Sequence, residues 1–249
     1  MLMMTYPDFA TILGNDINKT NISMLAKLGF SRQIERHNFL IKNILLKQIL
    51  KYPYAGKVLD LGCGDSPFRE IILQTATEYV GVDNKITNSI NTFVNVAADI
   101  TKPLQFDDGS FDSVVMFNVL DDIPDPLSLL VESMRVLKKQ GGLFMITPFM
   151  WKIHDEPFDY YRFSRFGLEY LLKKSGYINI EIKEVGPRFW GCWFLQFNYF
   201  TLRFLRPWNK YPFYIIWWMT QIIGMALDRF NFSISNSSTS HYSISAYKP

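Results

Sequence analysis

The sequence predicts an α/β protein in which helices cover both faces of a mostly parallel, doubly wound sheet. Between residues 57 and 185, short apolar runs of strand length alternate with stretches of helical periodicity. The runs are nearly continuous in apolar residues, as in strands that are buried on both faces. Residues typical of helix starts and helix ends separate them. Because parallel strands need crossover connections, this alternation predicts a sheet layered between helices.

The composition excludes several classes of protein. The chain has 249 residues, of which 48% are hydrophobic and 20% charged, so it is neither disordered nor collagen-like. Its net charge of +3 is too small to predict nucleic-acid binding. The two cysteines cannot form a disulfide framework and the three histidines lie far apart in the chain, so we expect a reducing compartment and no bound metal. The N-terminal residues lack the basic start and apolar run of a secretory signal, which predicts a cytoplasmic protein.

Residues 1–52 are expected to form an N-terminal extension. Residues 1–30 have weak periodicity and many turn-prone side chains, which predict a loosely organised arm. From Ser31 to Tyr52, apolar residues recur at helical spacing among charged ones, which predicts an amphipathic helix. Pro53 is expected to end that helix.

The sheet is expected to begin with KVLDLG, residues 57–62, an apolar run that ends in glycine. Ser66 and Pro67 predict the N-cap and first position of a helix that runs to about Gln74. The next three strands are expected over residues 78–83, 93–99 and 111–120.

A second cap signal precedes the next helix. Asp125 and Pro126 predict its start, and Lys138 and Lys139 are expected to lie in its last turn, where positive charge favours the helix dipole. The fifth strand is then expected over residues 141–148.

The last part of the predicted sheet shows the same order of a cap residue, a helix and a strand. Ser164 is expected to cap a helix that ends at Gly176, a residue suited to the left-handed position after a helix. Residues 177–186 are expected to form the sixth strand and residues 241–248 the last one. One α/β domain over residues 53–186 and 233–249 is therefore expected.

Residues 187–232 differ from the rest and are expected to be a helical insertion before the last strand. They hold five of the six tryptophans and several arginines and lysines, but one acid, Asp228. Aromatic helix faces flanked by basic residues favour peripheral contact with an anionic membrane surface. A lid on the sheet edge or a dimer interface is the alternative. The apolar run over residues 211–227 is short and interrupted for a membrane span.

The first strand leads into a candidate ligand-binding turn, VLDLGCGDSPF. Gly62 and Gly64 allow a tight turn and close backbone approach, and the following amides can hold a polar ligand. A nicotinamide fingerprint requires a third glycine three positions after Gly64, where this chain has Pro67. The turn therefore argues for a nucleotide-like ligand and against a nicotinamide oxidoreductase.

Two strand-end acids are expected at the same edge of the sheet. Asp83 ends the second strand at about the offset from Gly62 at which an acid binds the ribose hydroxyls of a nucleotide. Asp99 ends the third strand and can accept a hydrogen bond from an adenine amino group. The alternatives are an acid in a turn for Asp83 and a solvated loop acid for Asp99.

The order of these motifs resembles the class I S-adenosylmethionine-dependent methyltransferases. VLDLGCG, VGVD, AADI, FDSVVMFNVLDDIPDP and LKKQGGLFMITP follow one another across residues 57–185. The resemblance implies a seven-stranded, Rossmann-like sheet whose last strand is antiparallel, with S-adenosylmethionine as cofactor. It also implies that the hinge from Asn118 to Asp121 covers the methyl-donor centre. Asp121 and Asp122 depart from the family, since many relatives carry Glu-His there, so any role of that histidine is absent.

The resemblance assigns the cofactor residues by motif. In the family, the turn from Gly62 to Gly64 lies under the methionine part, the acid matching Asp83 binds the ribose and the one matching Asp99 binds the adenine amine. The complete set of cofactor-binding residues predicted in this way is Asp60, Gly62, Cys63, Gly64, Asp83, Asn84, Asp99, Ile100 and Asn118.

The segment after the fifth strand, PFMWKIHDEPFDYYRFS, is the expected substrate side of the site. It resembles a segment of a bacterial subgroup linked to glycan or other cell-envelope biosynthesis. His154 and Asp159 are the catalytic candidates, because a histidine titrates in the range that suits a general base. A structural histidine bonded to Asp155 or Asp159 is the alternative. The substrate-binding candidates are Asp155, Tyr160, Tyr161 and Arg162, and Arg162 is equally suited to clamping an anion and to pairing with Asp159.

The sequence thus predicts a methyltransferase that moves a methyl group from S-adenosylmethionine to an oxygen or nitrogen atom. The acceptor is expected to be a small molecule or a lipid-linked envelope precursor, and a membrane contact would place the protein at the inner face of the membrane. The alternative from another class is a non-catalytic S-adenosylmethionine-binding or membrane-scaffold protein.

Overall fold

The computed structural model describes residues 39–64, 66–84, 95–205, 210–229 and 238–249. The expected arm over residues 1–30 and the start of the first expected helix lie outside this part. The chain divides into two units, Met1–Asn38 and Phe39–Pro249, and the description below concerns the second.

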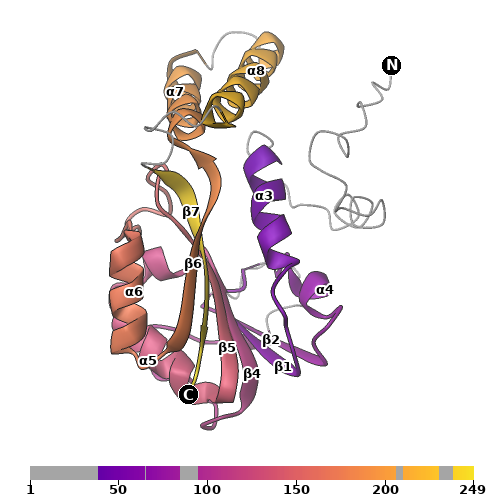
Figure 1. Ribbon diagram of the computed structural model, residues 1–249, viewed down its shortest axis with the longest axis vertical. Coiled ribbons are helices and arrows are strands. Elements are labelled where there is room, and N and C mark those ends of the chain that lie inside the picture. Colours follow the sequence, from indigo (N-terminus) through magenta and orange to yellow (C-terminus); the bar gives the residue numbers. More distant parts are fainter. Residues whose placement is uncertain (1–38, 65, 85–94, 206–209, 230–237) are drawn as a thin grey trace. The chain divides into compact units, whose positions relative to one another are not determined.

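Seven strands form one sheet in the order β3-β2-β1-β4-β5-β7-β6 (Figure 1). Neighbours from β3 to β5 pair in parallel, and β7 pairs antiparallel with both β5 and β6. This confirms the predicted seven-stranded, mostly parallel sheet with an antiparallel last strand. The strands are β1 (Lys57–Leu61), β2 (Glu78–Asp83), β3 (Val96–Ala97), β4 (Phe111–Phe117), β5 (Leu137–Pro148), β6 (Ile178–Arg188) and β7 (Thr239–Tyr247).

Helices flank the sheet on both faces. In Figure 1, α5 and α6 lie on one face and α3 and α4 on the other, while α7 and α8 follow the end of β6. The helices are α3 (Phe39–Ile49), α4 (Arg69–Ile72), α5 (Pro126–Val136), α6 (Arg165–Lys174), α7 (Phe189–Leu205) and α8 (Lys210–Arg229), with a 3-10 turn, η2 (Leu120–Asp122).

The central strands are buried on both faces. Leu59 in β1, Val114 in β4 and Leu143 in β5 are completely inaccessible to solvent. Covering both faces with helices removes these apolar side chains from water, and this burial is the main stabilising contribution to such a sheet. The near-continuous apolar runs in the sequence therefore reflect the layered architecture.

Local capping explains where two helices begin. The Asp125 carboxylate accepts a hydrogen bond from Ser128 N, and the Ser164 hydroxyl accepts one from Gly167 N. Both caps were predicted and both are confirmed, because a short polar side chain satisfies amides that the helix leaves unpaired. Gly176 has a φ of +92° after α6, as predicted for a left-handed position.

Two predicted helix ends are wrong. Ser66 does not cap α4: its φ is +50°, and the helix begins at Arg69 without a side-chain cap. Lys138 and Lys139 do not end α5, which stops at Val136, because the chain joins β5 at Leu137. Lys138 Nζ instead lies 2.8 Å from the Asp112 carboxylate on β4. Its charge therefore forms an ion pair between two strands and does not act on the end of a helix.

Several strands differ in length from the prediction: β5 begins at Leu137 instead of residue 141, and β4 ends at Phe117 instead of residue 120. Within the described residues, β3 is only Val96–Ala97, and residues 85–94 before it are not described. β6 continues to Arg188, two residues further than expected, and α7 follows directly at Phe189.

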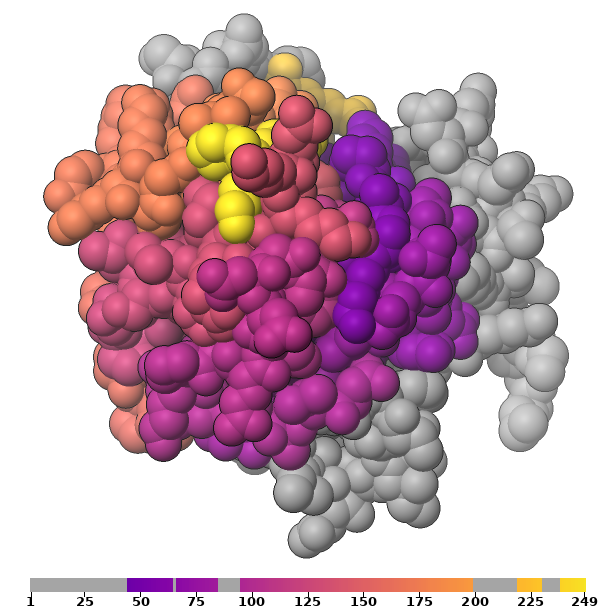
Figure 2. Space-filling model, turned by 90° about the horizontal axis from the view of Figure 1, so that it is seen from below, coloured from indigo at the N-terminus to yellow at the C-terminus, as the bar shows by residue number. Residues whose placement is uncertain are grey.

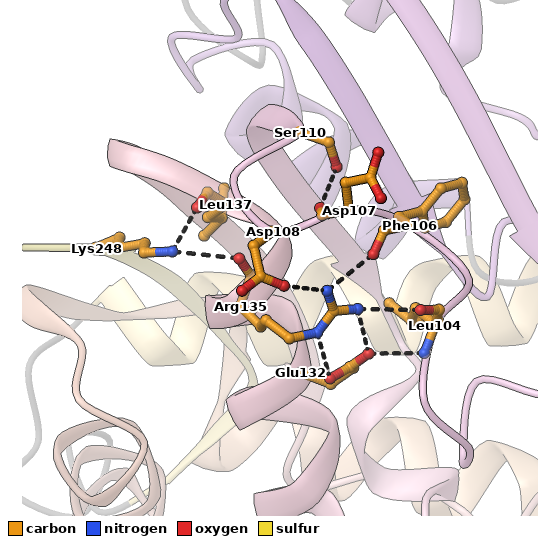
Figure 3. Close-up of polar contacts among 9 residues, drawn as sticks. All are labelled: Leu104, Phe106, Asp107, Asp108, Ser110, Glu132, Arg135, Leu137 and Lys248. Atoms are coloured by element: carbon orange, nitrogen blue, oxygen red, sulfur yellow. Dashed lines mark hydrogen bonds and ion pairs between the residues drawn. The ribbon is translucent and has the colours of Figure 1, made fainter.

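A polar network around Arg135 anchors the loop before β4 to α5 (Figure 3). The Arg135 guanidinium pairs with Glu132, whose carboxylate also accepts from Leu104 N at 2.7 Å. The Arg135 guanidinium also donates to the carbonyl oxygens of Leu104 and Phe106. Lys248 Nζ donates to the carbonyl oxygens of Arg135 and Leu137, and Figure 2 shows the yellow C-terminal residues at the surface beside pink residues around 140. The end of the chain is thereby hydrogen-bonded to the junction between α5 and β5.

Candidate functional site

The turn after β1 has the backbone geometry that requires glycine. Gly62 has a φ of +71° and Gly64 a φ of +51°, a region that costs side chains with a Cβ. A Cβ on Gly62 would lie 2.6 Å from a methyl of Val119, whereas one on Gly64 would meet no described atom within 4 Å. The turn is therefore packed against the segment after β4 on one side and open at Gly64.

Hydrogen bonds join this turn to the end of β2. Gly64 N donates to Asp83 Oδ2 at 2.8 Å. Gly62 N and Cys63 N both donate to the Val82 carbonyl oxygen, at 2.8 and 3.1 Å. The glycine turn and the acid that ends β2 thus form one continuous surface at the carboxyl edge of the sheet, the edge at which doubly wound folds bind ligands.

Asp60 and Cys63 lie beneath this surface. Asp60 is buried and its Oδ2 accepts a hydrogen bond from the Tyr79 hydroxyl at 2.6 Å. Burial raises the pKa of Asp60 to about 7. Burial also raises the pKa of the Cys63 thiol to about 12, so this cysteine is not a thiolate at neutral pH.

The residues after β2 and β3 are arranged differently from those of the turn. Asn84 is exposed, and Ile100 is buried in the core. The Asp99 carboxylate accepts hydrogen bonds from the amide and hydroxyl of Thr101 and pairs with Lys102 at 3.4 Å. These contacts to Thr101 and Lys102 lower the pKa of Asp99. The structure thus brings Asp83 to the glycine turn, but the described contacts of Asp99 stay within its own loop.

The segment after β4 adjoins the turn. Asn118 is exposed with a φ of +55°, and its N–H donates to the Ile146 carbonyl oxygen at 2.8 Å. Val119 packs against Gly62. Asp121 and Asp122 follow in η2. Two residues after the contact with the turn, the chain therefore presents a pair of carboxylates.

The segment after β5 brings an imidazole to this pair. His154 Nδ1 lies 3.2 Å from Asp159 Oδ2, and its Nε2 lies 3.6 Å from Asp121 Oδ2. Arg162 holds Asp159 through both carboxylate oxygens, one contact being 2.8 Å from Nη2 to Oδ2. Of the alternatives left open by the sequence, the structure shows the pairing of Arg162 with Asp159 and the bonding of His154 to Asp159.

The aspartates of this cluster have very different pKa values. Hydrogen bonds from Arg162 hold the pKa of Asp159 far below its ordinary value. Burial raises the pKa of Asp121 to about 6. Burial, together with the neighbouring charge of Asp121, raises the pKa of Asp122 to about 7.

The remaining substrate-side candidates line the outside of the cluster. Asp155 and the tyrosine side chains are exposed, at 45% for Tyr160 and 38% for Tyr161. The amides of both tyrosines donate to the Asp121 carbonyl oxygen, and the Tyr161 hydroxyl donates to that of Pro124. These bonds fix the segment after β5 onto the segment after β4.

Sequence reasoning missed the importance of Asp121. Donor atoms of Asp121, Asp122, His154 and Asp159 lie within 4.8 Å of one another. The separation of the histidines along the chain argued against a cluster of metal-ligating side chains, but carboxylates from another segment lie beside His154 and form such a group with it. The available signal was the Asp121–Asp122 pair itself, at the carboxyl end of a predicted strand.

Comparison with known sequences gives a family match for part of the chain. Residues 59–145 match a family model described as "Methyltransferase domain". Ubiquinone biosynthesis O-methyltransferase of Pseudomonas aeruginosa is 31% identical over 130 residues, which cover 48% of this chain and 53% of that protein. The chain thus spans about half the length of the curated relatives that it matches.

Comparison with solved structures supports the fold. A SAM-dependent methyltransferase from Archaeoglobus fulgidus superposes with a TM-score of 0.58 at 17% identity, covering 92% of this chain and 99% of that one. Phosphoethanolamine N-methyltransferase 2 from Haemonchus contortus, solved with S-adenosyl-L-methionine, gives 0.51 at 18% identity and covers 99% and 60%. At this identity the likeness shows the fold alone.

Proposed function

We propose that this chain, which carries a class I S-adenosylmethionine-dependent methyltransferase domain, moves a methyl group from that cofactor to an oxygen or nitrogen atom of a small acceptor. The observation that carries the proposal is the bond between Gly64 N and Asp83 Oδ2 at the open side of the turn after β1. A glycine turn and a strand-end carboxylate in contact suit a ligand that carries a ribose.

The residues present fit the cofactor. Gly64 leaves space above the turn where a Cβ would meet no described atom within 4 Å, so a ligand can approach the backbone closely. Asp83 is proposed to bind the ribose hydroxyls, with Asn84 beside it. The remaining proposed contacts are Asp60, Gly62, Cys63, Asp99, Ile100 and Asn118.

The cofactor supplies an electrophilic methyl group on a sulfonium. The chain therefore mainly has to align the acceptor and exclude water, a positioning effect that can reach about 7 to 11 kcal/mol. Val119 connects the proposed cofactor side of the site to the acceptor side. It packs on the turn after β1, and Asp121, two residues later, lies beside His154.

His154 and Asp159 are proposed to assist the acceptor. With Nδ1 held by Asp159 at 3.2 Å, the imidazole presents Nε2 as a base for an acceptor proton. Arg162 fixes Asp159 and thereby the ring. Asp155, Tyr160, Tyr161 and the outer edge of Arg162 are proposed to contact the acceptor.

The acceptor is proposed to be a hydroxyl compound of the cell envelope, either a glycan or a lipid-linked precursor. The name of the matched Pseudomonas relative, an O-methyltransferase, favours oxygen over nitrogen. The resemblance of the segment after β5 to an envelope-related subgroup supports the compound class. Production of S-adenosylhomocysteine with a cell-envelope extract tests this, and a cofactor that binds without turnover would indicate a non-catalytic protein instead.

Helices α7 and α8 are proposed to touch a membrane surface. Trp193 and Phe197 are 50% and 44% exposed on one face of α7, and Met219, Ile222 and Ile223 are exposed on α8. None of the described helices is long and apolar enough to cross a membrane. Exposed aromatic faces on helices of this kind suit the interface between headgroups and acyl chains.

Flotation with phosphatidylglycerol-containing liposomes tests the membrane proposal. The double variant Trp193→Ser/Phe197→Ser should lose flotation. Phe166→Ser/Tyr170→Ser is a matched control, because those exposed aromatics have the same i, i+4 spacing on α6. Equal flotation of the two variants would rule out α7 as the contact.

A further inference from the structure

The most unusual feature of the site is a buried carboxylate without a hydrogen bond. The Asp121 side chain is 0% exposed, and among the described residues neither of its oxygens has a hydrogen-bond partner. Asp122 Oδ1 is buried without such a partner as well. Buried polar atoms in proteins are paired in the great majority of cases, so three unpaired oxygens on two neighbouring aspartates need a physical explanation.

The contacts of His154 bear on the unpaired oxygens of Asp121. Arg162 Nη2 already donates to Asp159 Oδ2 at 2.8 Å and to the Lys152 carbonyl oxygen at 3.1 Å, so its two protons are used. Arg162 Nη2 also lies 3.4 Å from His154 Nδ1. Because the protons of Nη2 are directed to Asp159 and Lys152, we assign the proton between His154 Nδ1 and Asp159 Oδ2, which are 3.2 Å apart, to the imidazole. In the neutral ring, Nε2 then carries the lone pair, and it lies 3.6 Å from Asp121 Oδ2. A lone pair facing an ionised carboxylate is repulsive, and a cation between the two atoms would relieve that repulsion.

We propose that Asp121, Asp122 and His154 bind a divalent cation through carboxylate oxygens and Nε2, with Asp159 orienting the imidazole. A histidine that gives its second ring proton to a carboxylate is the usual arrangement behind a metal ligand. Two donors at about 2.1 Å from a tetrahedral metal lie about 3.4 Å apart, close to the 3.6 Å between Nε2 and Asp121 Oδ2.

The charge and donor chemistry agree with this assignment. Metal ligation requires the ionised forms of Asp121 and Asp122. In those forms, together with the Asp159 carboxylate and the Arg162 guanidinium, they sum to a net charge of −2 beside a neutral His154. Mixed oxygen and imidazole donors suit Mn²⁺, Fe²⁺ or Zn²⁺ better than Ca²⁺ or Mg²⁺.

The cation would change the role of His154 in catalysis. As a ligand, Nε2 holds the cation, and an acceptor hydroxyl bound to the cation loses its proton more readily. This consequence rests on the proposed function, whereas cation binding does not. The two can therefore fail separately.

Titration with Mn²⁺ alone tests the binding. The untagged full chain, treated with a chelator and dialysed without S-adenosylmethionine, should bind one Mn²⁺, followed by electron paramagnetic resonance of the free ion and by calorimetry. Asp121→Asn and His154→Ala should each weaken binding at least about tenfold, and Asp159→Asn about 10- to 100-fold. Asp107→Asn is the control, because it removes the same charge from an exposed loop acid.

Two results would overturn the assignment. The first is a wild-type chain that binds neither Mn²⁺ nor Zn²⁺, which would leave a proton on His154 as the positive species. The second is an equal loss of affinity in Asp107→Asn. Circular dichroism checks each variant, and if Asp121→Asn does not fold, His154→Ala decides alone, since that side chain is partly exposed.

Discussion

Gly64 N donates to Asp83 Oδ2 at 2.8 Å and so joins the turn after β1 to the end of β2. Parallel pairing of β1 with β2 brings Leu61 opposite Val82, which places the two strand ends at one edge. Gly64 itself has a φ of +51°, which favours glycine at this position of the turn. A local glycine conformation and a sheet register together make the candidate nucleotide site.

Replacing Asp83 should weaken cofactor binding. Asp83→Ala removes a charged acceptor, and we expect a loss of about 1.5 to 3 kcal/mol in the binding free energy of S-adenosylmethionine, measured by calorimetry. Glu78→Ala, at the opposite end of β2, should leave the affinity unchanged. Undiminished binding by Asp83→Ala would remove the proposed pocket.

Replacing His154 should affect turnover and not cofactor affinity. Loss of a base, or of a ligand that activates the acceptor, typically costs about 10²- to 10⁴-fold in rate. We therefore expect His154→Ala to form S-adenosylhomocysteine slowly with a cell-envelope extract while binding the cofactor within about twofold of wild type. Full activity would reduce His154 to a structural residue held by Asp159.

Replacing Asp228 should loosen the start of α7. Its Oδ1 accepts from Trp190 N at 2.9 Å, and its Oδ2 accepts from Arg188 N at 2.8 Å and Gly191 N at 3.1 Å. Asp228→Ala leaves these amides without that acceptor, so we expect a loss of about 1 to 2 kcal/mol in unfolding free energy and faster amide exchange at the start of α7.

Urea denaturation and hydrogen exchange measure this effect. Glu181→Ala is the control, because it removes an exposed acid from β6 and should change stability by less than about 0.5 kcal/mol. Unchanged exchange in Asp228→Ala would contradict the capping role.

His241 should make the fold sensitive to acid. Burial lowers its pKa from 6.5 to about 3, and its ring lies 5.2 Å from that of Trp151. As the pH falls below 6.5, the unfolded chain takes up a proton that the folded chain refuses, so stability declines. The resulting loss at pH 5 is about 2 kcal/mol.

The variant His241→Asn should remove this part of the pH dependence. We expect its unfolding free energy, measured in urea at pH 7.5 and pH 5, to fall less between the two conditions than that of the wild type. The comparison uses the difference between pH values, so any constant cost of the substitution cancels. Equal slopes would mean that His241 titrates normally.

Much of the fold follows from local patterns in the sequence. The apolar runs predicted the strands, and Asp125 and Ser164 predicted two helix starts, because burial and capping act on residues that are close in the chain. The predictions for Ser66 and Lys138 were wrong because they also relied on local patterns alone. Each resembled a helix-end residue locally, but the path of the turn and the pairing of β4 with β5 decided their conformations.

The sequence by itself determined the class of sheet, the glycine turn and the acid that ends β2, since each depends on backbone conformation or on strand periodicity. Only the tertiary structure decided that His154 lies between Asp159 and the buried Asp121. Their proximity arises because β4 and β5 are adjacent and parallel, so the segments that follow them leave the sheet at one edge. No sequence pattern within the segment after β4 or the segment after β5 predicts that these side chains lie close together.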